Sequence, residues 1–169
     1  MSLGPVHLLL LVVAVQRLAE LAWSRRNERL LRARGAVEHG ARHYPLIVLL
    51  HAALLAALWR AAPAERPLVL PWFLAWLALQ PLRLWVVASL GERWTTRVLT
   101  LPGAPLVTRG PYRWLRHPNY LIVLLEVPVL ALACDEPRWA AVFGIANGVV
   151  LALRIAVEER ALGLRPDRS

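Results

Sequence analysis

The residues best suited to chemistry lie in one stretch, residues 101–120, which reads LPGAPLVTRGPYRWLRHPNY. It combines four prolines and two glycines with one histidine and two tyrosines, which is more than a connecting loop needs for its turns. Pro118 places Asn119 and Tyr120 at the start of a helix, where free backbone N–H groups favour a negative charge. We therefore predict that a carboxylate or another anionic group of a ligand binds here.

A second polar cluster closes the last apolar segment and consists of Arg154, Glu158 and Glu159. The i, i+4 spacing of Arg154 and Glu158 places both on one face of a helix, which permits a simple ion pair. Arg154 also falls within an apolar run, where a charge is costly and commonly marks a functional site. Both interpretations remain open from the spacing alone.

Five apolar segments must position these residues, because 58% of the 169 residues are hydrophobic and the mean hydropathy of +0.48 excludes an ordinary soluble domain. We predict a single all-α integral membrane domain over residues 1–169, with about five transmembrane helices and the last two forming a short hairpin. Residues 1–90 would be the transmembrane scaffold, and residues 91–169 the cofactor-binding loop, hairpin and C-terminal tail. The predicted segments are 3–23, 44–62, 68–90, 120–134 and 139–157.

The basic residues predict the orientation of the chain in the membrane. All 20 are arginines, and the net charge is +9. Fourteen of them lie on one side of the predicted membrane, in the loops 24–43 and 91–119 and in the C-terminal tail (Arg160, Arg165, Arg168). Only three lie on the other side: Arg60, Arg66 and Arg138. By the positive-inside rule the N-terminus lies outside, and the C-terminus and the site lie on the cytoplasmic side of what we take to be a bacterial plasma membrane. The arginines flank apolar spans, so we expect membrane lipids and no nucleic acid as partners.

Other polar residues within the spans have structural interpretations. The i, i+3 spacing of Arg17 and Glu20 predicts a neutralised ion pair near the cytoplasmic end of the first span. We expect His51, in the second span, to form a hydrogen bond between helices. Glu126 is open between two roles, since it could pair with Arg83 or Arg154, or line the cavity for an acceptor substrate.

Several kinds of site are excluded by what the sequence lacks. The single cysteine, Cys134, rules out an intrachain disulfide, and no arrangement of His, Cys, Asp and Glu has the spacing of a metal site, so we predict no metal. The G-x-G-x-x-G pattern of dinucleotide-binding domains is absent too. A nucleotide-like cofactor must therefore be held in another way.

Taken together, the motifs resemble those of the isoprenylcysteine carboxyl methyltransferases and their bacterial relatives, over roughly residues 90–165. The resemblance rests on two groups of residues. The first is Leu106-Val107, Gly110, Tyr112 and the block from Arg116 to Tyr120, and the second is Arg154, Glu158-Glu159 and Leu162. Residues 17–45 are similar to a small bacterial branch associated with type III polyketide synthases.

The resemblance implies a pocket for S-adenosylmethionine, with Arg154 orienting the acceptor substrate as the catalytic residue. Glu159, Arg116 and Glu126 are possible additions. The residue chemistry agrees, since Glu158 can accept hydrogen bonds from ribose hydroxyls or an ammonium group and tyrosine rings can pack on adenine. The implied cofactor-binding residues are Ala104, Pro105, Leu106, Val107, Tyr112, His117, Pro118, Asn119, Tyr120 and Glu158.

The implied reaction is methyl transfer to a carboxylate or phenol oxygen of a lipophilic acceptor that enters from the bilayer, such as an isoprenylcysteine-like compound, a lipidated substrate, a long-chain alkylresorcinol or an alkylpyrone. Three alternatives stay open: a phospholipid N-methyltransferase, a membrane sterol-type reductase with a similar R-H-P-N-Y block, and a non-enzymatic membrane scaffold. The sequence does not indicate the oligomeric state of the protein.

Overall fold

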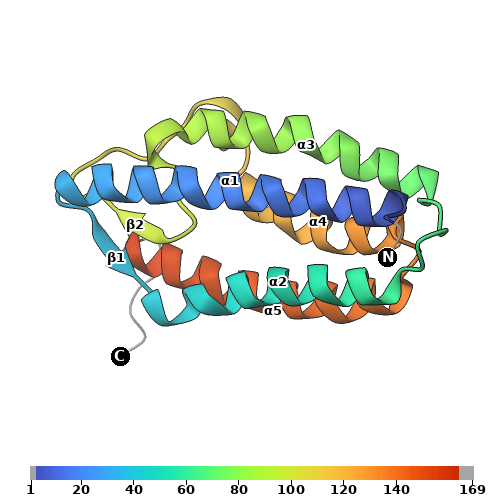
Figure 1. Ribbon diagram of the computed structural model, residues 1–169. Coiled ribbons are helices and arrows are strands. Elements are labelled where there is room, and N and C mark those ends of the chain that lie inside the picture. Colours follow the sequence, from blue (N-terminus) through green and yellow to red (C-terminus); the bar gives the residue numbers. More distant parts are fainter. Residues whose placement is uncertain (1–2, 164–169) are drawn as a thin grey trace.

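The computed structural model describes residues 3–163, in which five helices lie roughly along one common direction (Figure 1). Three short 3-10 turns and two short strands join them at the ends. The all-α prediction is confirmed. The helices are α1 Pro5–Ala33, α2 Tyr44–Ala61, α3 Leu70–Leu90, α4 Pro118–Ala133 and α5 Pro137–Ala161; the turns are η1 Ala41–His43, η2 Gly91–Arg93 and η3 Gly110–Arg113; the strands are β1 Val37–His39 and β2 Val98–Thr100.

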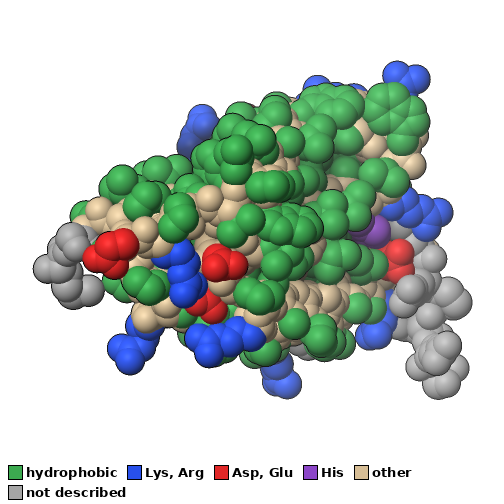
Figure 2. Space-filling view, turned by 90° about the vertical axis from the view of Figure 1, so that its right-hand side faces the viewer, with side chains coloured by type: hydrophobic (Ala, Val, Ile, Leu, Met, Phe, Trp, Pro, Cys, Tyr) green, Lys and Arg blue, Asp and Glu red, His purple; other side chains and the backbone are tan. Residues whose placement is uncertain are grey.

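Within the described residues, four helices are long and apolar enough to cross a membrane, namely α1, α2, α3 and α5. The fourth helix in the chain, α4, has 16 residues and rises only about 24 Å, so it is shorter than a typical span, as the sequence predicts. Large aliphatic side chains point outward from the bundle, among them Ile145 (71% exposed) and Leu18 (66% exposed). Hydrophobic side chains cover most of the face drawn in Figure 2, which is the surface expected of a protein surrounded by lipid.

Helices α4 and α5 form the predicted hairpin, joined by a tight turn in which Asp135 has a φ of 58°. Each helix begins with a proline, Pro118 or Pro137, at the position where the missing N–H costs nothing. Helix α5 therefore begins at Pro137, two residues before the predicted start of the last apolar segment at residue 139. Helix α4 packs against both α3 and α5, and its first turn follows directly after the loop over residues 101–117.

The prediction of a loop from residue 24 was wrong, because α1 continues to Ala33. Residues 24–33 are mostly arginine, leucine, glutamate and alanine, which favour helix, and the first glycine is Gly35. Apolar content marks only where a helix crosses the bilayer and does not mark where it ends. The extra turns carry α1 beyond the apolar span.

The tail arginines Arg165 and Arg168, which were counted in the prediction of membrane orientation, lie outside the described residues.

The two strands form a small antiparallel ribbon, in which Val37 pairs with Thr100 and His39 pairs with Val98. The sequence analysis did not predict it, since three residues are too few to show a periodic pattern. The ribbon lies at the end of the bundle where α5 ends, opposite the end where α1 begins (Figure 1). It ties the chain after α1 to the segment after α3.

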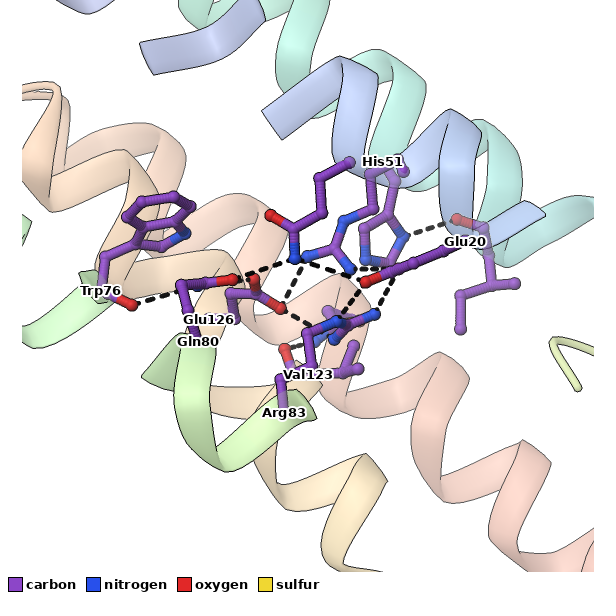
Figure 3. A network of polar contacts seen from close by, with 11 residues as sticks. Glu20, His51, Trp76, Gln80, Arg83, Val123 and Glu126 are labelled. Atoms are coloured by element: carbon purple, nitrogen blue, oxygen red, sulfur yellow. Dashed lines mark hydrogen bonds and ion pairs between the residues drawn. The ribbon is translucent and has the colours of Figure 1, made fainter. Parts of the chain in front are cut away.

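A charge network inside the bundle joins α1, α3 and α4 (Figure 3), and we refer to Arg17, Glu20, Arg83 and Glu126 as the intramembrane network. Arg83 donates to Glu20 through Nε at 2.5 Å and Nη2 at 2.6 Å, and to Glu126 through Nη1 at 3.0 Å. Arg17 contacts the same two carboxylates at 2.9 and 2.6 Å. The predicted pair of Arg17 and Glu20 is thus confirmed as half of a neutral set of four charges.

His51 lies beside this network (Figure 3). Its Nδ1 hydrogen-bonds to the carbonyl oxygen of Ile47 at 2.7 Å, one turn earlier in the same helix. The hydrogen bond found for His51 is therefore within α2, whereas the sequence predicts a bond between helices.

Candidate functional site

A cavity of about 210 Å³ lies at the ribbon end of the bundle. Its wall brings together segments that are far apart in the chain: the end of α1, the connection from α3 through β2 to η3, the first turn of α4 and the last turns of α5. All the predicted cofactor residues except Pro118 line it, and so does Arg154. They are Ala104, Pro105, Leu106, Val107, Tyr112, His117, Asn119, Tyr120, Arg154 and Glu158.

The loop that carries these residues is fixed to α3 by a close contact at Gly110. This residue has a φ of 58°, and a Cβ atom there would lie 2.1 Å from Ser89 Oγ, so only glycine fits without displacement. The neighbouring Arg109 donates from Nε to the carbonyl oxygen of Ser89 at 2.8 Å. Together these contacts hold η3, and with it Tyr112, against the end of α3.

Three residues of the cavity wall carry buried polar atoms without a hydrogen-bond partner among the described residues, namely both ring nitrogens of His117, Oδ1 of Asn119 and Nε1 of Trp94. His117 lies between two carboxylates, with Nδ1 3.9 Å from Glu158 and Nε2 3.6 Å from Glu159, both beyond ordinary hydrogen-bond length. Buried polar groups are nearly always paired, so these atoms form a set that a polar ligand can complete.

Tyr120 connects the two ends of the predicted Arg154 and Glu158 pair. Its hydroxyl accepts a hydrogen bond from Arg154 Nε at 2.9 Å and donates one to Glu158. The side chains that the i, i+4 spacing places on one face are thus joined through a tyrosine of α4. The arrangement engages Nε of Arg154, which is itself a residue of the cavity wall.

Tyr112 lines the same cavity as Glu158. Burial, with a smaller contribution from the charge of Glu158, raises the pKa of Tyr112 above its ordinary value. Its hydroxyl therefore stays protonated at neutral pH and is available as a hydrogen-bond donor.

Four residues that the sequence analysis named do not line this cavity. Pro118 is buried as the first residue of α4, and Arg116 is exposed. Glu159 lies 3.6 Å from Nε2 of His117 and is not part of the cavity wall. Glu126 is one of the four charges of the intramembrane network, which confirms its pairing with Arg83.

The sequence analysis missed the contribution of the segment just after α3. Arg93, Trp94, Arg97 and Thr100 line the cavity, and Arg93 also donates to the carbonyl oxygen of Pro105 at 2.5 Å. In the sequence, Arg93 and Arg97 are explained equally well by the orientation of the chain in the membrane. Their position alone therefore does not indicate a binding site.

Arg97 joins the ribbon to the bundle through Glu38 and Glu28, at 2.5 and 3.3 Å, and its guanidinium lies 4.2 Å from the ring centre of Tyr44. Burial alone would raise the pKa of Glu38, but hydrogen bonds and charges from Arg97 and Arg32 hold it below its ordinary value. Glu38 is thus ionised at neutral pH and fastens β1 to β2 and α1.

A second, smaller cavity of about 20 Å³ adjoins the first, between the ribbon, α2 and α5. Arg154, Arg97 and Val98 line both. The remaining wall includes apolar side chains of two membrane-spanning helices, Ile47 of α2 and Val150 and Val157 of α5. Arg154 therefore lies at the junction of the two cavities.

Comparison with known proteins identifies the family. The sequence model of the isoprenylcysteine carboxyl methyltransferase (ICMT) family matches residues 72–163, which is more than half of the chain. The chain belongs to the ICMT family. This confirms the resemblance stated above and identifies an integral membrane methyltransferase. Methyltransferases of the ICMT family use S-adenosylmethionine.

Two bacterial relatives match nearly the whole chain. YpbQ, an uncharacterized protein of Bacillus subtilis, is 37% identical over 159 residues, which is 92% of this chain and 95% of the relative. An uncharacterized protein of Haemophilus influenzae is 28% identical over 158 residues, which is 86% of this chain and 88% of the relative. No solved structure matches the chain. Within the described residues no group of three or more His, Cys, Asp or Glu is placed to hold a metal ion.

Proposed function

We propose that this ICMT-family protein transfers a methyl group from S-adenosylmethionine to an oxygen atom of a lipophilic acceptor. One observation supports this above the others. A single cavity collects the loop of Ala104 to Val107, the start of α4 and the pair of Arg154 and Glu158, although these lie up to about 55 residues apart in the chain. Such convergence of polar groups in one concave site is typical of a binding site for a cofactor.

The cavity residues fit S-adenosylmethionine by their chemistry. The unpartnered atoms of His117 and Asn119 match a carboxylate and an ammonium group, and Glu158 can accept hydrogen bonds from ribose hydroxyls or the ammonium. The rings of Tyr112 and Tyr120 offer faces for adenine and for a positive charge. When bound, the cofactor supplies a methyl group on a positively charged sulfur.

Arg154 is the residue that we assign to the acceptor. Its Nε is engaged by Tyr120, so its terminal nitrogens are available at the junction of the two cavities. A guanidinium there attracts an anionic oxygen and holds it in a fixed direction, which is the main task of an enzyme for an in-line displacement. The apolar part of the acceptor would then lie toward α2 and α5 and the bilayer.

The charges around the junction favour an oxygen acceptor over an amine. Arg154 lines both cavities and has no ion-pair partner among the described residues, whereas Arg97 is neutralised by Glu38 and Glu28. Positive side chains repel the protonated amine of an aminophospholipid and attract a carboxylate or a phenolate. Isoprenylcysteine-like compounds, long-chain alkylresorcinols and alkylpyrones all offer such an oxygen on an apolar chain.

The excess of arginine at the ribbon end favours a cytoplasmic site in a bacterial plasma membrane, with the N-terminus outside. In that orientation the water-soluble cofactor reaches the larger cavity from the cytoplasm. The acceptor reaches Arg154 sideways from the lipid.

The experiment that tests the proposal uses membranes containing the protein, methyl-labelled S-adenosylmethionine and mass spectrometry of the lipid extract. The wild type should yield a methylated lipid. Arg154→Ala should lose this product and keep its affinity for S-adenosylhomocysteine, because the residue faces the acceptor. Arg160→Ala, an exposed arginine on the same helix, is the matched control and should retain the product. Absence of a methylated lipid with the wild type, or an unchanged yield with Arg154→Ala, would contradict the proposal.

A further inference from the structure

Four consecutive residues between two parts of the cavity wall point away from it: Arg113, Trp114, Leu115 and Arg116, here called the RWLR segment. Trp114 is 66% exposed and Leu115 is 47% exposed, and both arginines are exposed. A tryptophan and a leucine side by side on a polar loop cost free energy in water. We therefore expect these two side chains to contact an apolar partner.

The position of the segment along α3 indicates what that partner is. Trp114 packs edge to face on Trp85, with ring centres 6.0 Å apart. Trp85 lies five residues before the end of α3, or about 7.5 Å along the helix axis, and it is 45% exposed beside the 65% exposed Leu84. These outward side chains belong to a membrane-spanning helix, so the RWLR segment lies along its lipid-facing side, just inside the helix end.

The segment also carries positive charge that the protein does not neutralise. Residues 101–120 contain no aspartate or glutamate. The guanidinium of Arg113 lies 4.9 Å from the ring centre of Trp114, and neither Arg113 nor Arg116 has a carboxylate partner within the described part of the chain. Arg66 and Arg97, by contrast, pair with Glu136 and Glu38.

An exposed indole and leucine flanked by unpaired arginines match the layered chemistry of a membrane surface, with acyl chains below and phosphates above. We propose that the RWLR segment is a binding site for the head groups of anionic phospholipids. The segment is bounded by Tyr112 and His117, which line the cavity. Lipid binding therefore also stabilises the cavity wall and raises cofactor affinity, and this second part rests on the proposed function.

Lipid binding is tested first, in bilayer nanodiscs, by quenching of Trp114 fluorescence with brominated lipids. The difference between the wild type and Trp114→Phe isolates this indole. Brominated phosphatidylglycerol should quench it more strongly than brominated phosphatidylcholine, and Arg113→Gln/Arg116→Gln should abolish the preference. Arg138→Gln is the matched control, since Arg138 also stacks on a tryptophan, Trp139, but at the opposite end of the bundle. Equal quenching by the two lipids would overturn the proposal.

Coupling to the cavity is tested by titrating the same proteins with S-adenosylhomocysteine. Phosphatidylglycerol should tighten binding by the wild type and the Arg138→Gln protein several-fold, up to about fivefold for each arginine near an anionic surface, and should have no effect on the double variant. Selective quenching with the same affinity in both lipids would overturn the coupling alone. Selective quenching with no affinity in either lipid would instead contradict the proposed function and leave the lipid site standing.

Discussion

The intramembrane network and the cavity at the ribbon end of the bundle use the same kinds of residue in opposite ways. In the network, Arg17 and Arg83 face two carboxylates at 2.5 to 3.0 Å, and the four charges neutralise each other. In the cavity, His117 and Asn119 keep buried atoms without partners among the described residues. The comparison teaches that charge in a membrane protein does not by itself mark a catalytic site. In the network the complete set of partners indicates a structural role, whereas the unpaired atoms of the cavity wall can form hydrogen bonds with a ligand.

The two regions share one helix. Tyr120 and Glu126 both belong to α4, six residues or about 9 Å apart along its axis. The network fixes α4 to α1 and α3, while the start of the same helix faces the cavity. Stability and binding should therefore respond separately to substitutions less than two turns apart.

The largest effect is expected from removing one charge of the network. Glu126→Gln leaves two arginines against Glu20 alone, and a buried charge without its partner costs about 3–5 kcal/mol of stability. Thermal unfolding in lipid nanodiscs should show a large drop in Tm. In the protein that remains folded, affinity for S-adenosylhomocysteine should stay near the wild-type value.

A matched variant sharpens this prediction. Arg83→Met/Glu126→Gln removes one charge of each sign and leaves Arg17 paired with Glu20, so it should recover part of the lost stability. A double variant that is no more stable than Glu126→Gln would show that packing, and not charge balance, is what matters at this position.

A smaller effect is expected from Glu38, which joins the ribbon to the bundle at the edge of the cavity. Its pKa is held below the ordinary value of 4.5, so its ion pairs stabilise the fold above that value and are lost as the pH falls through the lowered pKa. At pH 7, Glu38→Gln should be less stable by about 1 kcal/mol. Unfolding measured as a function of pH should show the two proteins converging in acid, and a constant difference would argue against an ionised Glu38.

Much of the cavity could be predicted from the sequence because its chemistry is concentrated in two short motifs. Tyr112, His117 and Tyr120 stand in one loop and helix start, and Arg154 and Glu158 stand one turn apart on one helix. Local spacing is enough to group each set, and the family resemblance joins the two sets.

The rest depends on contacts between residues distant in sequence. The ribbon pairs His39 with Val98, and three-residue strands leave no periodic signal. The full network brings Glu20 and Glu126 together from α1 and α4, which the i, i+3 pair of Arg17 and Glu20 does not reveal. The polar extension of α1 to Ala33 was missed since hydropathy follows the bilayer and not the helix.

The central claim is that the unpaired polar atoms of the cavity are there to bind the cofactor. Its most direct test is calorimetric titration with S-adenosylhomocysteine of the wild type, His117→Ala and Glu158→Gln. Both variants should bind about 10- to 100-fold more weakly with a nearly unchanged Tm, as expected when a hydrogen bond to a charged group is lost. Glu92→Gln, which removes an exposed carboxylate outside the cavity, should bind like the wild type. Wild-type affinity in both cavity variants would contradict the account.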